Sequence, residues 1–278
     1  MKNTEEVQVG IIGGSGVYEL LDDARTVTIA TPYGPTSGPL AIGRLGGADV
    51  AFLARHGEGH RLAPHRVPYR ANVWALASLG VRAIVASSAV GGLSPSTPTG
   101  SFVVPDQLLD RTRDRADTFF DGSYQQPGVQ HLGFADPYCP VLRESMIGAL
   151  KGADEQFSPV GTTVVIPGPR FSTRAESDAW RAAGAHIVNM TQYPEAALAA
   201  ELDVGYVSLS FVTDADTGHS VGDEPVTAEA VFRRLTEAKP RIAAAIEGTI
   251  QRIPHDYAPR ELIDRSAVGM VLARSAEV

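Results

Sequence analysis

The sequence contains a single cysteine, Cys139, so no disulfide within the chain can stabilise its fold, and nothing in it indicates an oxidising compartment. It also lacks any apolar run approaching the roughly 20 residues that a membrane-spanning helix needs. The segment Met1–Glu6 shows neither the basic start nor the apolar stretch of a secretory signal peptide. These absences predict a cytoplasmic protein that contacts no membrane.

An excess of positive charge is also missing, since 24 Lys and Arg against 32 Asp and Glu give a formal net charge of −8. A general nucleic-acid binder normally presents a basic face, so nucleic acid is not an expected partner. A small anionic ligand is still compatible with this charge, because a pocket can be locally basic in an acidic protein. One locally basic stretch, in which most side chains are expected to be solvated, contains Arg55, His56, His60, Arg61, His65, Arg66 and Arg70.

Short apolar runs alternate with amphipathic helical patterns from one end of the chain to the other. This alternation is typical of an α/β domain whose sheet is covered on both faces. No linker, internal repeat or change of composition divides the chain, so residues 1–278 are predicted to form one domain. The predicted strands are Val7–Ile12, Asp49–Leu53, Ala83–Ser88, Phe102–Val104, Thr162–Ile166, Ile187–Met190 and Tyr206–Val212. The predicted helices are Tyr69–Leu79, Val141–Leu150, Arg174–Ala183, Pro194–Leu202, Ala228–Gln251 and Arg260–Ala273.

Polar residues lie at, or directly after, the carboxyl ends of five of the predicted strands. In open α/β sheets, ligands gather at the carboxyl ends of strands, so five polar clusters at five strand ends predict one site. The clusters are Ser15, Arg55-His56, Ser87-Ser88-Ala89, Asn189-Met190-Thr191 and Asp214/Asp216.

The turn Gly13–Gly16 indicates a seat for an anion. It lacks the third glycine of a dinucleotide-binding fingerprint and the Lys-Ser/Thr of a nucleoside-triphosphate loop. A tight turn remains, whose backbone N–H groups and Ser15 hydroxyl can face an anion. Arg55 matches phosphate oxygens bidentately, His56 adds a titratable donor, and Ser88 and Thr191 supply hydroxyl groups. This combination favours inorganic phosphate held without a metal.

Asp214 and Asp216 allow three interpretations. A metal site needs further ligands, and only His219 is close in sequence. The pair can also cap a turn. In the third interpretation, burial raises the pKa of one carboxyl, which protonates a leaving-group nitrogen while the other accepts from an exocyclic amine. Protonation of N7 relieves the charge that builds up on a departing purine.

Five blocks in this order resemble the trimeric nucleoside phosphorylase family, and more closely its branch that contains 5′-methylthioadenosine phosphorylase. The similarity runs from about residue 7 to residue 250. The blocks are Ile11–Gly16, Leu53–Gly57, Tyr69–Leu76, Gly168–Glu176 and Asn189–Thr191.

The resemblance implies a single domain with a central mixed sheet flanked by helices, and phosphate as co-substrate without any cofactor or metal. It places phosphate among Ser15, Arg55, His56, Ser88, the Ala89 backbone and Thr191. It also places Met190 under the ribose, Phe171 and Ser172 beside the purine, and Asp214 and Asp216 as the catalytic pair at the base. Family members with two such aspartates prefer 6-aminopurines, whereas relatives that prefer 6-oxopurines carry Asn there.

The resemblance further implies a homotrimer in which His131 reaches an adjacent subunit and covers the 5′ substituent. An apolar 5′ pocket is expected around Val231, with Ala228 and Phe232 nearby. The implied reaction converts 5′-methylthioadenosine and phosphate to adenine and 5-methylthioribose 1-phosphate, in purine and methionine salvage.

The alternatives are a purine nucleoside phosphorylase of broader specificity (adenosine, 5′-deoxyadenosine, inosine or methylthioinosine), a nucleosidase that uses water, and a non-catalytic sensor. The missing third glycine disfavours a dinucleotide oxidoreductase.

Overall fold

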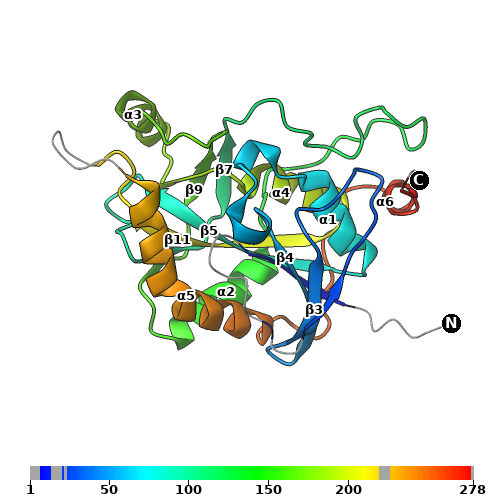
Figure 1. Cartoon of the computed structure of the whole chain (residues 1–278), viewed down its shortest axis with the longest axis horizontal. Helices are drawn as coiled ribbons and strands as arrows, with labels where there is room; N and C mark the ends of the chain where they lie inside the picture. Colours follow the sequence, from blue (N-terminus) through cyan, green and yellow to red (C-terminus); the bar gives the residue numbers. More distant parts are fainter. Residues whose placement is uncertain (1–6, 14–20, 22–23, 219–225, 277–278) are drawn as a thin grey trace.

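The computed structural model describes residues 7–13, 21, 24–218 and 226–276 (Figure 1). In this part of the chain one mixed sheet of 11 strands forms the centre, and helices flank it. The predicted α/β class and mixed sheet are therefore confirmed. The strands are β1 (Val9–Gly13), β2 (Arg25–Val27), β3 (Leu40–Leu45), β4 (Ala48–Ala54), β5 (Ala83–Gly92), β6 (Phe102–Val103), β7 (Gln107–Asp110), β8 (Phe157–Ser158), β9 (Thr162–Val165), β10 (Ile187–Asn189) and β11 (Gly205–Asp214). The helices are α1 (Tyr69–Ser78), α2 (Pro140–Gly152), α3 (Arg174–Ala182), α4 (Gln192–Glu201), α5 (Ala228–Ile250) and α6 (Arg265–Leu272), with short 3₁₀ turns η1 (Glu58–His60) and η2 (Pro64–Arg66).

Strand β5 is the centre of the sheet, where the sheet branches. Its first residues pair in parallel with β1, and its last two, Gly91 and Gly92, pair antiparallel with β10. Its other edge pairs in parallel with β11 along the whole strand, and β4 lies parallel to β1 on the far side. The carboxyl ends of β1, β4, β5 and β11 therefore lie at the same edge of the sheet, where α/β proteins place their ligands.

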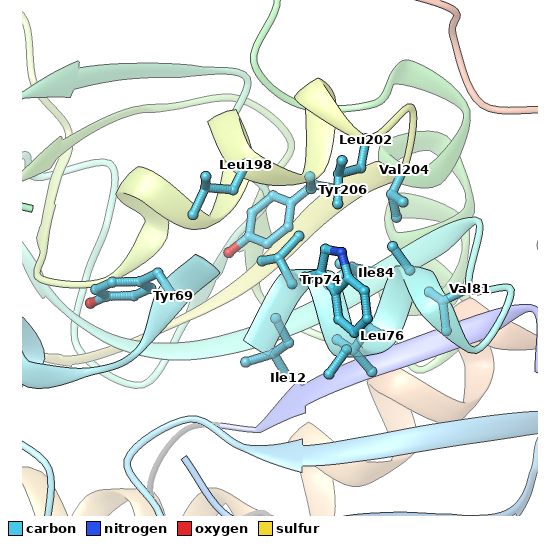
Figure 2. Close-up of a cluster of buried hydrophobic side chains, with 14 of the residues drawn as sticks. Ile12, Tyr69, Trp74, Leu76, Val81, Ile84, Leu198, Leu202, Val204 and Tyr206 are labelled. Atoms are coloured by element: carbon cyan, nitrogen blue, oxygen red, sulfur yellow. The ribbon is translucent and has the colours of Figure 1, made fainter. Parts of the chain in front are cut away.

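Alternate strand residues separate two hydrophobic layers. Ile12 and Ile84 belong to the cluster with α1, α4 and α6, part of which is drawn in Figure 2. Their neighbours Ile11 and Val85 belong to the cluster with α2 and α5 on the opposite face. All four side chains are fully buried. The sheet is thus covered on both faces, which explains why β1 and the first half of β5 (Ala83–Ala86) are apolar on both faces rather than alternating.

Four short or edge strands, β2, β3, β7 and β8, are absent from the sequence prediction. Strand β3 contains Gly43 and the exposed Arg44, and β2 is mostly exposed, so neither forms an apolar run. Their pairing with β4 and with each other defines them instead. Edge strands of this kind carry little local signal because neighbouring strands, rather than their own composition, fix their conformation.

Several boundaries also differ from the prediction. Helix α6 begins at Arg265 rather than Arg260, because the Asp264 carboxylate caps it and accepts hydrogen bonds from the backbone N–H groups of Ser266 (2.9 Å) and Ala267 (3.4 Å). Strand β11 continues to Asp214 rather than ending at Val212. Helix α4 begins at Gln192 rather than Pro194. The last two differences matter, because they place Asp214 on β11 and Thr191 at the N-cap of α4.

The segment 111–139 contains neither helix nor strand and runs from β7 past α1 towards α6, as the long loop drawn in green in Figure 1. The Arg274 guanidinium holds part of this loop, because it donates to the Phe119 carbonyl (3.1 Å) and lies over the Tyr124 ring (3.8 Å to the ring centre). None of the helices in the described ranges is long and apolar enough to span a bilayer.

Candidate active site

A cavity of about 300 Å³ opens at the carboxyl ends of the parallel strands. Its walls come from the segments that follow β4 and β10, the ends of β5 and β11, the segment 166–172 and the first turns of α5. Its volume lies at the lower end of the range for small-molecule sites. The residues predicted from the sequence that line it are Arg55, His56, Ser88, Ala89, Phe171, Ser172, Met190, Thr191, Asp214, Asp216 and Val231.

Arg55 is a buried cation with only 1% of its surface exposed. Its Nε and Nη2 atoms donate to the two Glu195 carboxylate oxygens (2.5 and 2.9 Å), and Nη1 donates to the Ser87 carbonyl (2.8 Å). Burial lowers the pKa of the guanidinium, but Glu195 outweighs burial and raises it, so the charge is permanent. These contacts use three of the five N–H groups, and within the described residues two remain for an anion.

His56 is neutral at physiological pH. Burial, reinforced by the nearby Arg55 charge, lowers its pKa to about 3. Its Nδ1 atom lies 2.8 Å from the Leu62 carbonyl, which only an N–H can satisfy, so the proton is assigned to Nδ1 and Nε2 is left as an acceptor. The ring also stacks on His60, with 4.1 Å between the ring centres. The expected donor at His56 is therefore an acceptor towards a ligand.

Side-chain amides hold the hydroxyl groups of the site in place. The Asn189 Oδ1 atom accepts from the backbone N–H groups of Thr191 and Gln192 (both 2.7 Å), which fixes the turn where α4 begins. Gln192 in turn donates from Nε2 to the hydroxyls of Ser88 (3.2 Å) and Ser210 (2.9 Å). Ser88 on β5 and Thr191, between β10 and α4, are thus held in place, and both line the cavity together with Arg55.

The aspartate pair sits on an irregularity at the end of β11. The register of β11 against β5 shifts between Val212 and Asp214, and Asp216 has the left-handed φ of 53°. Asp214 accepts two hydrogen bonds, from the backbone N–H of Asp216 (2.8 Å) and from the Thr213 hydroxyl (2.7 Å). Asp216 pairs with the Ser177 hydroxyl on α3. The two carboxyl groups are therefore held by separate partners, side by side in the cavity wall.

Gly91 on β5 makes room for this pair. A Cβ atom there would lie 3.1 Å from the Asp214 Oδ1 atom, 3.1 Å from the Asp216 Cβ atom and 2.9 Å from Val188. Close approach, rather than a special backbone angle, requires glycine at this position.

Burial raises the pKa of both aspartates. Asp214 reaches about 6 because burial outweighs the Thr213 hydroxyl and the Asp216 N–H, which favour the ionised form. Burial raises the pKa of Asp216 as well, against the stabilising effect of Ser177. A carboxyl with a pKa near neutrality can both hold and release a proton at physiological pH, as a general acid must.

The remaining walls suit a flat ring and an apolar group. Phe171 is 36% exposed and borders the cavity beside Ser172, whose Oγ atom is buried without a hydrogen-bond partner in the described part of the chain. Met190 packs against Gly168, where a Cβ atom would lie only 2.6 Å from its Sδ atom. Apolar residues of α5 complete this side: Ala228, Val231, Phe232 and Leu235.

The other two predicted residues differ in outcome. Ser15 falls outside the described residues. His131 is exposed on the long loop and does not line the cavity of its own chain. Among the described residues, no group of three or more His, Cys, Asp or Glu side chains is arranged to hold a metal ion.

Four further residues at the site, which are not among the predicted ones, are Glu195, Ser177, Thr213 and Arg115. Arg115 donates to the carbonyls of Tyr193 (2.5 Å), Met190 (2.8 Å) and Pro167 (3.1 Å), so it ties together two segments next to the cavity. No motif marks these residues in the sequence. Glu195 is recognised as a site residue only in three dimensions, because it is buried on α4 and pairs with Arg55.

Comparisons with known proteins agree with this geometry. A model of the Phosphorylase superfamily matches residues 8–251. The chain is 50% identical over 246 residues to an S-methyl-5′-thioadenosine phosphorylase of Mycobacterium tuberculosis (88% of this chain, 89% of the relative). It is also 46% identical over 258 residues to a purine nucleoside phosphorylase of Streptomyces coelicolor (91% and 92%).

A solved structure shares the fold. Methylthioadenosine phosphorylase from Schistosoma mansoni in complex with adenine superposes with a TM-score of 0.84 at 36% identity, covering 88% of this chain and 91% of that one. The chain therefore belongs to the phosphorylase superfamily, as a nucleoside phosphorylase of the group that contains the methylthioadenosine phosphorylases.

Proposed function

We propose that this cavity catalyses the phosphorolysis of 5′-methylthioadenosine to adenine and 5-methylthioribose 1-phosphate, as a step of purine and methionine salvage. One observation carries the proposal: two buried aspartates with raised pKa values share a cavity with a buried guanidinium. The relative from M. tuberculosis, named for this activity, is 50% identical and supports the substrate.

Phosphate occupies the Arg55 side of the cavity. The two remaining guanidinium N–H groups donate to its oxygens, together with the hydroxyls of Ser88 and Thr191, the Ala89 N–H and the Ser15 hydroxyl. Neutral His56 accepts a hydrogen bond at Nε2 from the hydroxyl of monohydrogen phosphate. Glu195 keeps the guanidinium oriented, so a phosphate oxygen is aimed at C1′.

The purine occupies the aspartate side, between Phe171 and Ser172. As the glycosidic bond lengthens, positive charge develops on the sugar and negative charge on the base. Protonated Asp214 donates its proton to N7, and Asp216 accepts from the 6-amino group. General acid catalysis of this kind contributes typically about 10²–10⁴-fold to the rate. An ionised carboxylate would repel the O6 atom of an oxopurine, so the pair favours adenine.

The 5′ substituent lies against Val231 and its apolar neighbours on α5. A methylthio group loses little by leaving water there, whereas a 5′-hydroxyl loses its hydrogen bonds to solvent. His131 from an adjacent subunit covers this group in a homotrimer. Its exposure, and its position outside the cavity of its own chain, support an intersubunit role. The enzyme acts in the cytoplasm and needs no cofactor besides the co-substrate phosphate.

A purine nucleoside phosphorylase with broader base or 5′ tolerance is the second candidate, and the 46% identical S. coelicolor relative favours it. Two variants separate the candidates, Asp214→Asn and Asp216→Asn, each assayed on methylthioadenosine, adenosine and inosine. The proposal expects the wild type to prefer methylthioadenosine to adenosine and both to inosine, and the Asp216→Asn variant to gain relative activity on inosine. A wild type that prefers inosine would overturn the assignment of the aspartate pair.

A further inference from the structure

Two buried hydroxyl groups contact the aspartate pair. Each hydroxyl carries one hydrogen but lies near two possible acceptors. The Thr213 Oγ1 atom lies 2.7 Å from the Asp214 Oδ2 atom and 3.3 Å from the Val90 carbonyl oxygen. The Ser177 Oγ atom contacts the Asp216 Oδ2 atom and lies 3.1 Å from the Thr173 carbonyl oxygen. Thr213 is 1% and Ser177 0% exposed, so neither hydroxyl can turn to bulk solvent.

A hydroxyl carries one hydrogen and can donate to only one of its two neighbours at a time. When the carboxyl is ionised, the hydroxyl donates its hydrogen to the carboxylate and no longer donates to the backbone carbonyl. When the carboxyl is protonated, it donates to the hydroxyl oxygen, and the hydroxyl turns its own hydrogen to the carbonyl. Both states therefore keep the carboxyl and the hydroxyl hydrogen-bonded, without movement of any heavy atom. An arrangement with an apolar neighbour would leave one state with an unsatisfied buried group.

We propose that Thr213 and Ser177 are positioning residues that act as reversible hydroxyl relays, one behind each catalytic aspartate. Each hydroxyl reverses its donor direction when its aspartate gains or loses a proton, and so keeps the carboxyl in place throughout the reaction. The inference rests on the proposed function only for its role in catalysis, since the hydrogen-bond arrangement itself is a property of the unliganded protein.

Charged groups around the aspartate pair also influence the pKa values of Asp214 and Asp216. Arg234 on α5 donates to the Thr213 carbonyl, and Arg181 on α3 favours ionised Asp216, while Glu176 opposes it. The Asp216 charge also disfavours ionisation of Asp214 and so raises its pKa. Across the cavity, Arg55, His56 and His60 face the pair from the segment after β4. The relays differ from all of these because they add no charge and can serve either protonation state.

The test replaces each hydroxyl by an apolar group of similar shape, in Thr213→Val and Ser177→Ala. Thr213→Ser keeps the relay. Matched controls remove buried hydroxyls that donate to helix carbonyls far from the cavity: Thr249→Val (2.7 Å to the Ala245 carbonyl) and Ser145→Ala (3.0 Å to the Val141 carbonyl). The controls show what the loss of a buried hydroxyl does to folding alone.

The first readout is the carboxyl titration of the unliganded protein, followed by NMR with ¹³C-labelled aspartate. An ionised carboxylate loses a stronger hydrogen bond than a protonated one, so Thr213→Val is expected to raise the Asp214 pKa by about one pH unit, and Ser177→Ala to raise the Asp216 pKa similarly. Thr213→Ser and both controls are expected to leave the titrations unchanged. An unchanged Asp214 titration in Thr213→Val, or an equal change in the controls, would overturn the relay.

The second readout is the pH profile of kcat/KM for methylthioadenosine phosphorolysis. The acid must be protonated to donate, so the rate declines as pH rises above its pKa. Thr213→Val is expected to move this alkaline limb to higher pH by the same amount, and Thr213→Ser to restore it. If the Asp214 pKa measured by NMR shifts but the alkaline limb of the kcat/KM profile does not, the proposed role of Thr213 in catalysis is contradicted. If the wild type cleaves no purine nucleoside, the proposed function fails, and the titration still decides the relay.

Discussion

The raised pKa of Asp214 predicts that its neutral replacement, Asp214→Asn, makes the protein more stable at neutral pH while it abolishes most activity. Burial brings this pKa to about 6, against an ordinary value of 3.8. At pH 7.5 the folded protein must keep this carboxylate ionised in a site that is only 8% exposed. A difference of about two pH units corresponds to about 3 kcal/mol of unfolding free energy. The asparagine amide carries no charge and can donate to the Thr213 hydroxyl as a protonated carboxyl does.

The pH dependence gives the sign of the effect. Between pH 4 and 6 the folded protein binds the Asp214 proton more tightly than the unfolded chain does, so the stability due to this group is fully present below about pH 4 and is lost by pH 6. Asp214→Asn is therefore expected to equal the wild type near pH 4 and to exceed it by about 2–3 kcal/mol at pH 7.5.

Urea unfolding of both proteins at equal concentration, at pH 4 and pH 7.5, measures this difference. The exposed Asp256→Asn is the matched control, with an expected change below about 0.5 kcal/mol at either pH. The activity of Asp214→Asn on methylthioadenosine is expected to fall by about 10²–10⁴-fold. A variant that is no more stable than the wild type at pH 7.5 would refute the argument that burial opposes ionisation at this site.

Three further substitutions test the supports of the site. Glu195→Gln is expected to lower the unfolding free energy by about 3 kcal/mol or more, because it leaves the Arg55 charge buried and unpaired. The control Glu155→Gln, at a partly exposed ion pair, is expected to lower it by under about 1 kcal/mol. Equal losses of the two variants in urea unfolding would refute this. Gly91→Ala is expected to reduce kcat/KM at least about tenfold with an unchanged circular dichroism spectrum, since the Cβ atom displaces the aspartate pair; a fully active variant would show that the pair tolerates movement. Arg115→Lys is expected to raise KM for the nucleoside about tenfold, because one ammonium cannot reach the three carbonyls, that of Met190 among them. An unchanged KM would show that Arg115 does not position Met190 for binding.

Strands buried on both faces, such as β1, β5 and β11, are predictable from the sequence because they consist mostly of apolar and small residues. Strand β3 is not predictable in this way, because Gly43 and the exposed Arg44 interrupt its apolar run. The single-domain prediction is compatible with one sheet that joins all the described strands.

The cavity residues at strand ends are predictable because polar side chains directly after apolar strands mark the ligand edge of an α/β sheet. Supporting residues on helices carry no such mark. Nothing in the sequence distinguishes Glu195 and Ser177 from other helix residues. Their roles follow only from their burial, where Glu195 pairs with Arg55 and Ser177 contacts Asp216. The role proposed for His131 involves a second subunit, so a single chain does not determine it.

The central claim, that phosphate rather than water attacks C1′, is tested most directly by isotopic labelling. The purified protein is incubated with 5′-methylthioadenosine and ¹⁸O-labelled inorganic phosphate, and the products are identified by mass spectrometry. Attack by phosphate is expected to give adenine and a 5-methylthioribose 1-phosphate that retains every ¹⁸O atom of the phosphate, with no adenine formed when phosphate is omitted. Free methylthioribose, released at the same rate with or without phosphate, would contradict it.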